Sequence, residues 1–209
     1  TLTSGYVTSV RILDRPAAHR PPAAVVARSS KRCLAMTSLR KFTADDMFSF
    51  ANVNLDHLTE TYNLSFYLQY LVRWPEYFTI GETPAGRRMG YIMGKAEGIA
   101  ENWHGHVTAV TVAPEFRKIG LAQLFMCELE DISESRHNGY FVDLFVRVSN
   151  MLAITMYRKF GYVEYRRVLG YYSGEEDAWD MRKALSRDVD KKSMIPLKDP
   201  IHPEDLEDG

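Results

Sequence analysis

The feature that most constrains this chain is a junction at residues 104–126, where a strand pattern ends at Pro114 and a helix pattern begins at Leu121. The hexapeptide Arg117-Lys118-Ile119-Gly120-Leu121-Ala122 forms its corner. Gly120 and Ala122 keep large side chains away from the start of the helix, where unpaired N–H groups and the positive end of the helix dipole favour an anion. The corner therefore suits a pyrophosphate, although a plain surface helix start with basic residues has the same pattern.

A second segment whose residues can take part in binding or catalysis lies at residues 148–162, where a strand pattern ends and a helix pattern follows. Asn150 and Tyr157 are seven residues apart, which is two helical turns, so both side chains can lie on one face of the helix. An amide at this place can bond an amide-rich ligand such as pantetheine, and a phenol two turns on can give a proton to a leaving thiolate. Alternatively, Asn150 only caps the helix and Tyr157 is a core aromatic residue.

Around these segments, strand and helix patterns alternate along the chain. Strands are predicted at 39–42, 77–82, 89–97, 104–113, 140–148, 162–172 and 178–184, and helices at 43–52, 64–71, 121–136 and 151–160. This order predicts an α/β layer structure with a mixed sheet.

The length of 209 residues fits one domain with two tails. We predict that the domain spans residues 36–187. Residues 1–35 are rich in Pro and Arg and show no regular period, which indicates an extension without a fold: an upstream segment that is not native, a transit peptide or a disordered arm. Residues 188–209 are polar and contain proline, and we expect a mobile or partner-bound tail.

Charge and cysteine content exclude several classes of protein. The net charge is −1, but residues 1–35 carry six basic residues and one acidic residue, so residues 36–209 carry a net charge of −6. This body is not a basic nucleic-acid binder, and no apolar run is long enough for a membrane helix. Cys33 and Cys127 have no metal-ligand spacing and are expected to be reduced cytoplasmic thiols, with Cys127 buried.

The two segments together resemble the GNAT acetyltransferase superfamily. The corner matches its Arg/Gln-x-x-Gly-x-Gly/Ala loop, and Asn150 with Tyr157 matches its second motif. The resemblance implies the GNAT fold, a mixed, mostly antiparallel seven-stranded sheet flanked by about four helices, with acetyl-CoA as the acetyl donor and no metal. It assigns pantetheine to the backbone of Val110 and Val112 and to Asn150, and the pyrophosphate to the backbone of Arg117, Lys118, Ile119, Gly120, Leu121 and Ala122.

Further motifs resemble the catalytic subunits of NatB N-terminal acetyltransferases. They are Leu58-Thr59-Glu60-Thr61-Tyr62, Phe66-Tyr67-Leu68-Gln69-Tyr70, Trp74-Pro75-Glu76-Tyr77-Phe78, Trp103-His104-Gly105-His106-Val107-Thr108, Tyr171-Tyr172 and residues 180–187. This resemblance implies acetylation of nascent protein N-termini that begin Met-Asp, Met-Glu, Met-Asn or Met-Gln, in the cytoplasm. It also implies a large helical-repeat auxiliary subunit that docks near the ribosome, and the aromatic residues of 64–71 would belong either to that interface or to the core.

Several side chains are candidates for recognition of the substrate. His106 and Thr108 are predicted to share one strand face with Val110 and Val112, because side chains two residues apart point the same way. They would place hydrogen-bond donors beside the acetyl group, unless His106 is simply an interior histidine. By resemblance, Glu60, Tyr62, Tyr171 and Tyr172 close over the peptide N-terminus, and Gly170, where a larger residue is expected, would loosen that wall.

The implied reaction is direct attack of a neutral α-amine on the acetyl thioester. The pKa of an α-amino group is about 7.7–8.0, so part of it is neutral near pH 7. Tyr157 is the predicted general acid, and Glu60, Tyr171 and Tyr172 are candidates for a base. Two alternatives remain open: an acetyltransferase for lysines or small amines, and a non-catalytic module that binds acyl-CoA or a partner protein.

Overall fold

The computed structural model describes residues 37–54 and 60–206. The predicted extension at residues 1–35, Cys33 and the beginning of the Leu58-Thr59-Glu60 motif lie outside the described residues. The domain limits at 36 and 187 stay predictions.

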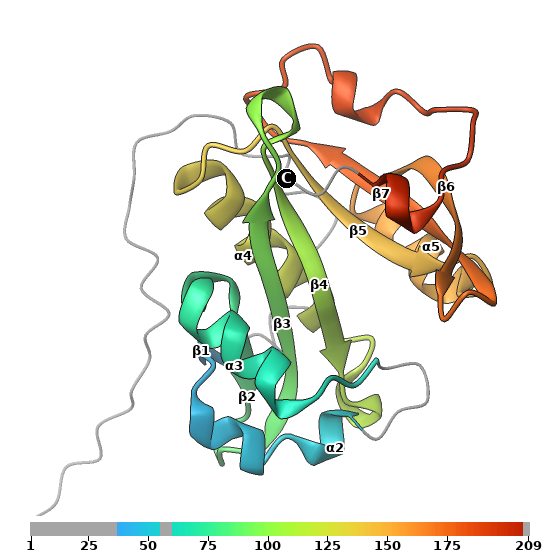
Figure 1. The fold of residues 1–209 in the computed structure, drawn as a ribbon. Helices are drawn as coiled ribbons and strands as arrows, with labels where there is room; N and C mark the ends of the chain where they lie inside the picture. Colours follow the sequence, from blue (N-terminus) through green and yellow to red (C-terminus); the bar gives the residue numbers. More distant parts are fainter. Residues whose placement is uncertain (1–36, 55–59, 207–209) are drawn as a thin grey trace, which may run out of the picture.

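The described strands form one mixed sheet in the order β1-β2-β3-β4-β5-β7-β6, and only β4 and β5 pair in parallel (Figure 1). The strands are β1 (Ser38–Lys41), β2 (Thr79–Glu82), β3 (Arg88–Glu97), β4 (His104–Val112), β5 (Phe141–Arg147), β6 (Val163–Tyr172) and β7 (Glu176–Ala184). The α-helices are α2 (Ala51–Asn54), α3 (Leu64–Arg73), α4 (Leu121–Ser135) and α5 (Met151–Lys159). The prediction of a seven-stranded, mostly antiparallel sheet with about four helices is confirmed.

The helix α4 follows from its apolar period. Leu121, Phe125, Leu129 and Ile132 recur at helical spacing and are all buried against the sheet. Full burial of each such side chain contributes about 1.5–3 kcal/mol. Cys127 lies off this face and is exposed, so the prediction of a buried cysteine was wrong. Its apolar neighbours in the sequence face the core, but the cysteine side chain does not.

The predicted helix at residues 43–52 is broken into a 3₁₀ turn at Ala44–Phe48 and the short helix α2. The reason is Asp46, which is buried and whose carboxylate accepts hydrogen bonds from the backbone N–H of Thr43 and from Arg40. The N–H of Ser49 then bonds to the carbonyl of Asp46, which ends the turn. A similar 3₁₀ turn at Pro75–Tyr77 delays the start of β2 to Thr79.

Two hydrophobic clusters cover the two faces of the sheet. One joins the sheet to α4 and α5, and the other joins it to α2 and α3. Tyr67 and Tyr70 belong to the second cluster, so these two aromatic residues are core and not surface. The exposed face of α3 instead carries Leu64, Leu68 and Val72, which are spaced four residues apart.

The sheet opens between β4 and β5. Their parallel pairing covers only Gly105–Val107 and Val142–Leu144, and the two strands then diverge (Figure 1). This divergence leaves a gap in the middle of the sheet, with α5 following directly from β5.

The tail from residue 188 was predicted to be mobile or partner-bound, and in its described part, up to residue 206, it is bonded to the domain itself. The N–H groups of Leu197 and Ile201 donate to the carbonyls of Tyr165 and Arg167, at 2.7 and 3.0 Å. Leu169 donates back to Ile201 at 2.8 Å. The tail therefore lies along β6, and in Figure 1 it runs down the outer side of that strand. Across the described ranges, none of the helices has the length and apolar character that a membrane crossing requires.

Candidate active site

A cavity of about 560 Å³ passes through the gap between β4 and β5. It is lined by all the predicted site residues except Ile119: Glu60, Tyr62, His106, Thr108, Val110, Val112, Arg117, Lys118, Gly120, Leu121, Ala122, Asn150, Tyr157, Tyr171 and Tyr172. The structure thus brings together residues from widely separated parts of the chain, while their individual roles stay predictions.

The corner before α4 turns through two left-handed residues. Lys118 has φ 63° and Gly120 has φ 90°, and Gly120 is the N-cap of the helix. The guanidinium Nε of Arg117 donates to the carbonyl of Val112 at 3.0 Å, which closes the loop back onto β4. The N–H groups at the start of α4 and the positive end of its dipole face this corner, which suits a phosphate. Ile119 points the other way and packs against the core, which is why it does not line the cavity.

Asn150 and Tyr157 lie at the start and near the end of α5. The side-chain oxygen of Asn150 accepts from the N–H of Ala153 at 3.1 Å, so this residue caps the helix as well as lining the cavity. Tyr157 is largely buried, and burial raises the pKa of its phenol. The phenol therefore stays protonated at neutral and moderately alkaline pH and is available as a proton donor.

The predicted sharing of one face by His106, Thr108, Val110 and Val112 was wrong. Met93 of β3 pairs with Ala109, but the next residue, Gly94, pairs with Val107, so Thr108 is an extra residue in β4. Such a bulge interrupts the alternation of side chains. As a result Val110 and Val112 pack with the α4 cluster, whereas Thr108 reaches toward α3 on the other face.

Thr108 is held by two tyrosines. The hydroxyl of Tyr70 lies 2.8 Å from its Oγ1, and the hydroxyl of Tyr62 donates to its carbonyl at 3.3 Å. Burial raises the pKa of both phenols. The segment containing Tyr62 is thereby fastened across the bulge.

Arg147 is a cavity residue that sequence reasoning missed. Its guanidinium bonds Glu60 at 2.5 Å and Glu176 at 2.9 Å, and it lies 4.0 Å from the ring centroid of Tyr172. Glu60 is therefore engaged in an ion pair that joins the segment before Tyr62 to the end of β5. The sequence offered one signal: Arg147 is a basic residue at the end of a largely apolar strand.

The opposite wall is firmer than Gly170 led us to expect. Gly170 has φ 60°, its N–H donates to Asp177 Oδ1 at 2.8 Å, and its carbonyl accepts from Gly174 at 3.0 Å. The expectation of a loose backbone was wrong, because glycine here permits a left-handed turn that two hydrogen bonds hold. Tyr172 donates to the carbonyl of Phe145 at 3.1 Å, and burial raises the pKa of Tyr171 to about 12.

His106 does not stand alone. Its Nδ1 lies 2.8 Å from Asp143 Oδ1, and Asp143 also lies 3.4 Å from Nε2 of His104. Burial alone would raise the pKa of Asp143, but the two histidines outweigh it and hold that pKa well below its usual range. Asp143 was missed, although a single acid within the apolar strand at 140–148 marked it.

Comparison with known families agrees with this geometry. The model of the Acetyltransferase (GNAT) family matches residues 36–162, which is more than half of the chain. The chain belongs to the GNAT acetyltransferase family.

Relatives within this family are similar over almost their whole length. The chain is 64% identical over 172 residues to the N-terminal acetyltransferase B complex catalytic subunit NAA20 of Arabidopsis thaliana, covering 82% of this chain and 99% of the relative. It is equally 64% identical, with the same coverage, to N-alpha-acetyltransferase 20 of Dictyostelium discoideum.

Solved structures of GNAT proteins agree in fold. Chaetomium thermophilum Naa20 in complex with a bisubstrate analogue is 41% identical with a TM-score of 0.76, covering 80% of this chain and 97% of that one. A NatB acetyltransferase complex bound to a bisubstrate inhibitor contains a chain that is 40% identical with a TM-score of 0.72, covering 81% and 98%.

Proposed function

We propose that this chain is the catalytic subunit of a NatB-type N-terminal acetyltransferase. It transfers the acetyl group of acetyl-CoA to the α-amine of proteins that begin Met-Asp, Met-Glu, Met-Asn or Met-Gln. The observation that carries the proposal is that one cavity has both a phosphate-type corner at one end and the polar pair His106 and Thr108 at the other. The identity of 64% to the NAA20 subunit from Arabidopsis thaliana supports the same function.

The donor lies, in this proposal, in the gap between β4 and β5. The backbone at 117–122 binds its pyrophosphate, and β4 at Val110 and Val112 pairs with the pantetheine amides. Asn150 caps α5 beside that path. This arrangement places the thioester between the bulge at Thr108 and the phenol of Tyr157.

Acetyl transfer then needs little chemistry from side chains. The neutral α-amine attacks the thioester carbonyl, the C–S bond breaks, and Tyr157 gives its proton to the leaving thiolate. The amine loses one proton to solvent or to a base. Of the three predicted candidates Glu60 fits this role, because burial raises the pKa of Tyr171 and of Tyr172 and keeps both phenols protonated at neutral pH. Orientation within the cavity supplies much of the acceleration, since held reactants no longer need to meet.

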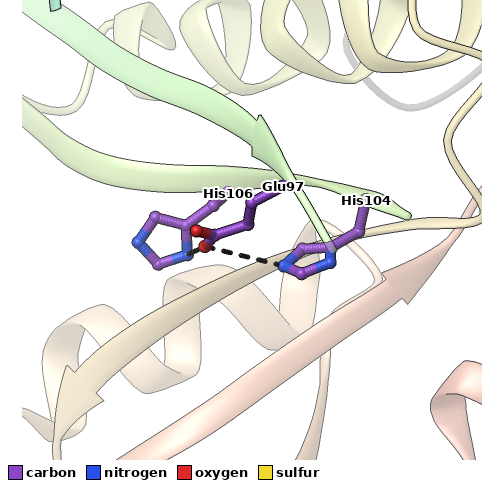
Figure 2. Close-up of side chains that lie close together, drawn as sticks. All are labelled: Glu97, His104 and His106. Carbon is purple, nitrogen blue, oxygen red and sulfur yellow. Dashed lines mark ion pairs between the residues drawn. The ribbon is translucent and has the colours of Figure 1, made fainter. Parts of the chain in front are cut away.

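The second side chain of the substrate is proposed to meet His106 and Thr108. Nδ1 of His106 is bonded to Asp143, and its other ring nitrogen points away from the acidic groups (Figure 2). A histidine and a hydroxyl can each donate or accept a hydrogen bond, so the same pair can serve Asp, Glu, Asn and Gln. The aromatic rings of Tyr62, Tyr171 and Tyr172 suit the methionine side chain.

A partner subunit is part of this proposal. Leu64, Leu68 and Val72 form an exposed apolar stripe on α3, and Phe48 beside α2 is 87% exposed. Exposed apolar patches of this kind mark protein interfaces. We assign the stripe to a large helical-repeat auxiliary subunit, through which the enzyme would reach nascent chains at the ribosome in the cytoplasm.

The test is acetyl transfer from acetyl-CoA to peptides that begin Met-Asp, Met-Glu, Met-Leu and Ser-Glu, with and without the auxiliary subunit. A strong preference for Met-Asp and Met-Glu is expected. Transfer to Met-Leu or Ser-Glu instead would mean that the fold is right and the substrate pocket is wrong. Binding of acetyl-CoA without transfer to any of the peptides, with the partner present, would favour a non-catalytic module.

A further inference from the structure

A cluster of metal-ligand side chains lies where β3, β4 and β5 run side by side. It consists of Glu97 at the end of β3, His104 and His106 on β4, and Asp143 on β5. One ligand atom from each of Glu97, His104 and His106 lies within 4.8 Å of the others, and Figure 2 shows the carboxylate between the two imidazoles. Acetyl transfer as proposed above uses only His106 from this cluster.

The distances from Glu97 to the two histidines are close to those between two ligands of one metal ion. Oε1 of Glu97 lies 3.7 Å from Nδ1 of His106 and 3.8 Å from Nε2 of His104. Asp143 Oδ1 lies 2.8 and 3.4 Å from the same two nitrogens. Ligand atoms about 2.0–2.2 Å from a tetrahedral Zn²⁺ are separated by about 3.3–3.5 Å. Glu97 therefore needs to move by only a few tenths of an ångström, whereas Asp143 must move away from His106 by about half an ångström to act as a ligand.

An unsatisfied atom points into this cluster. Nε2 of His104 is buried and has no hydrogen bond of good geometry, although Asp143 Oδ1 lies 3.4 Å away. The other nitrogen, Nδ1, lies 2.5 Å from the carbonyl of Asn102, so Nδ1 carries the proton in the neutral ring and Nε2 presents a lone pair. A buried lone pair among carboxylate oxygens is unfavourable unless a proton or a cation lies between them.

The surrounding residues hold these ligands in place. The ring of His104 stacks on Phe141 with the centroids 4.5 Å apart and the planes 6° from parallel. The second oxygen of Glu97 is paired with Lys95, which leaves Oε1 facing the imidazoles. Hydrogen bonds and ion pairs that orient ligands in this way are typical of protein metal sites.

We propose that Glu97, His104 and His106 form a Zn²⁺ site, with Asp143 within reach of both imidazoles as a fourth ligand. Two histidines and one or two carboxylates form a donor set that zinc accepts. On binding, the ion replaces the proton between His106 and Asp143 and satisfies the lone pair of His104. The displaced protons pass to solvent.

Zinc in this site would change how the enzyme selects peptides, a consequence that rests on the proposed function. Coordination through Nδ1 fixes His106 and places a positive ion behind the wall that meets the second side chain of the substrate. The binding itself does not depend on that function, because it can be measured without peptide or acetyl-CoA.

The experiment uses the full chain without an affinity tag and with Cys33→Ser and Cys127→Ser, so that thiols do not bind the metal. Zn²⁺ binding is measured by titration calorimetry against a competing chelator, and Co²⁺ is added separately to read tetrahedral coordination from its visible absorption. We expect one ion per chain. Glu97→Gln and His104→Gln should each weaken the binding on the order of a hundredfold.

The matched control is His137→Gln, which removes a histidine that pairs with Glu76 at 3.0 Å away from the cluster. This variant should bind zinc as tightly as the parent. Thermal unfolding without metal establishes that each variant is folded, and added Zn²⁺ should raise the Tm of the parent and of His137→Gln alone. The proposal is overturned if the parent binds no stoichiometric ion, or if folded Glu97→Gln and His104→Gln bind it as well as the parent does.

Discussion

The two ends of the cavity are built in different ways. At the end formed by residues 117–122 and Asn150, which is the donor end of the proposed function, the contacts join residues three and five positions apart. Examples are Asn150 with Ala153 and Arg117 with Val112. At the end around His106, Arg147 and Tyr172, several of the contacts join residues 27 to 87 positions apart, as between Tyr172 and Phe145 or between Glu60 and Arg147. This is the peptide end of the proposed function. One end is a local backbone arrangement and the other is a network of distant side chains.

This difference predicts how each end responds to change. At the donor end the backbone makes the site, so most side chains there can be exchanged without loss of acetyl-CoA binding. Binding is weakened when a substitution changes the backbone conformation or removes a hydrogen bond to the backbone. The peptide end fails when any one partner of the network is removed, because the remaining polar groups are then left without partners. Variants at the two ends should therefore separate acetyl-CoA parameters from peptide parameters.

The largest expected effect on the rate is that of a substitution at Tyr157, which lies between the two ends of the cavity in the proposed function. Tyr157→Phe should lower kcat roughly a hundredfold or more, because it removes the proton donor for the thiolate. Steady-state kinetics with a Met-Asp peptide measures this, and the KM values for both substrates should change little. Tyr162→Phe is the matched control, since its hydroxyl bonds Glu130 at 3.0 Å outside the cavity. A Tyr157→Phe enzyme with normal kcat would remove this phenol from the mechanism.

The next effect concerns the choice of substrate. Thr108→Val and His106→Gln should reduce the preference for Met-Asp over Met-Leu by about 10- to 100-fold, the equivalent of one hydrogen bond to a charged group. The ratio of kcat/KM values for the two peptides is the measurement, and the KM for acetyl-CoA should stay constant. An unchanged ratio would place the second side chain of the substrate elsewhere.

The contrast between local and long-range contacts also determines which features could be predicted from the sequence. The order of strands and helices and the residues of the donor corner follow from local patterns, and so they were predicted. The bulge at Thr108 was not predicted, because the sequence of β4 is compatible with a regular strand. Only the pairing of Gly94 with Val107, next to that of Met93 with Ala109, shows that Thr108 is an extra residue. Asp143 and Arg147 were missed for a related reason: each becomes functional through a partner on another strand or loop.

Arg147→Gln tests the network directly. It removes the partner of Glu60, Glu176 and Tyr172, and we expect the peptide KM to rise about tenfold, since each contact of this partly exposed group contributes only a few tenths to 1 kcal/mol. The KM for acetyl-CoA should not change. The control Arg158→Gln breaks an exposed pair with Glu164, and neither residue lines the cavity. A rise in the acetyl-CoA KM alone would contradict the division of the cavity into two ends.

Gly120→Ala tests the donor end in the same manner. Adding a side chain at φ 90° strains the corner by about 1 kcal/mol or more, so the KM for acetyl-CoA should rise by at least about fivefold, equally with every peptide. Gly86→Ala provides the control, because Gly86 has φ 78° in a turn that does not line the cavity. A peptide-dependent effect of Gly120→Ala would show that the corner also shapes the peptide end.

The smallest effect is that of pH. The α-amine has a pKa of about 7.7–8.0, so its neutral fraction and the rate should rise roughly fourfold between pH 7 and pH 8. Burial raises the pKa of Tyr157, and that of Tyr171 to about 12, so their protonated forms persist and no fall in rate is expected up to about pH 10. A pH–rate profile of kcat/KM that falls near pH 8 would exclude a phenol as the proton donor.

The tail on β6 has a consequence for the behaviour of the chain in solution. β6 is the last strand of the described sheet, and an uncovered last strand offers its backbone to strands of other molecules. Through Leu197 and Ile201 the tail occupies these groups. A chain shortened before residue 195 would thus keep its cavity and become prone to self-association along β6, so solubility here depends on a segment remote from catalysis.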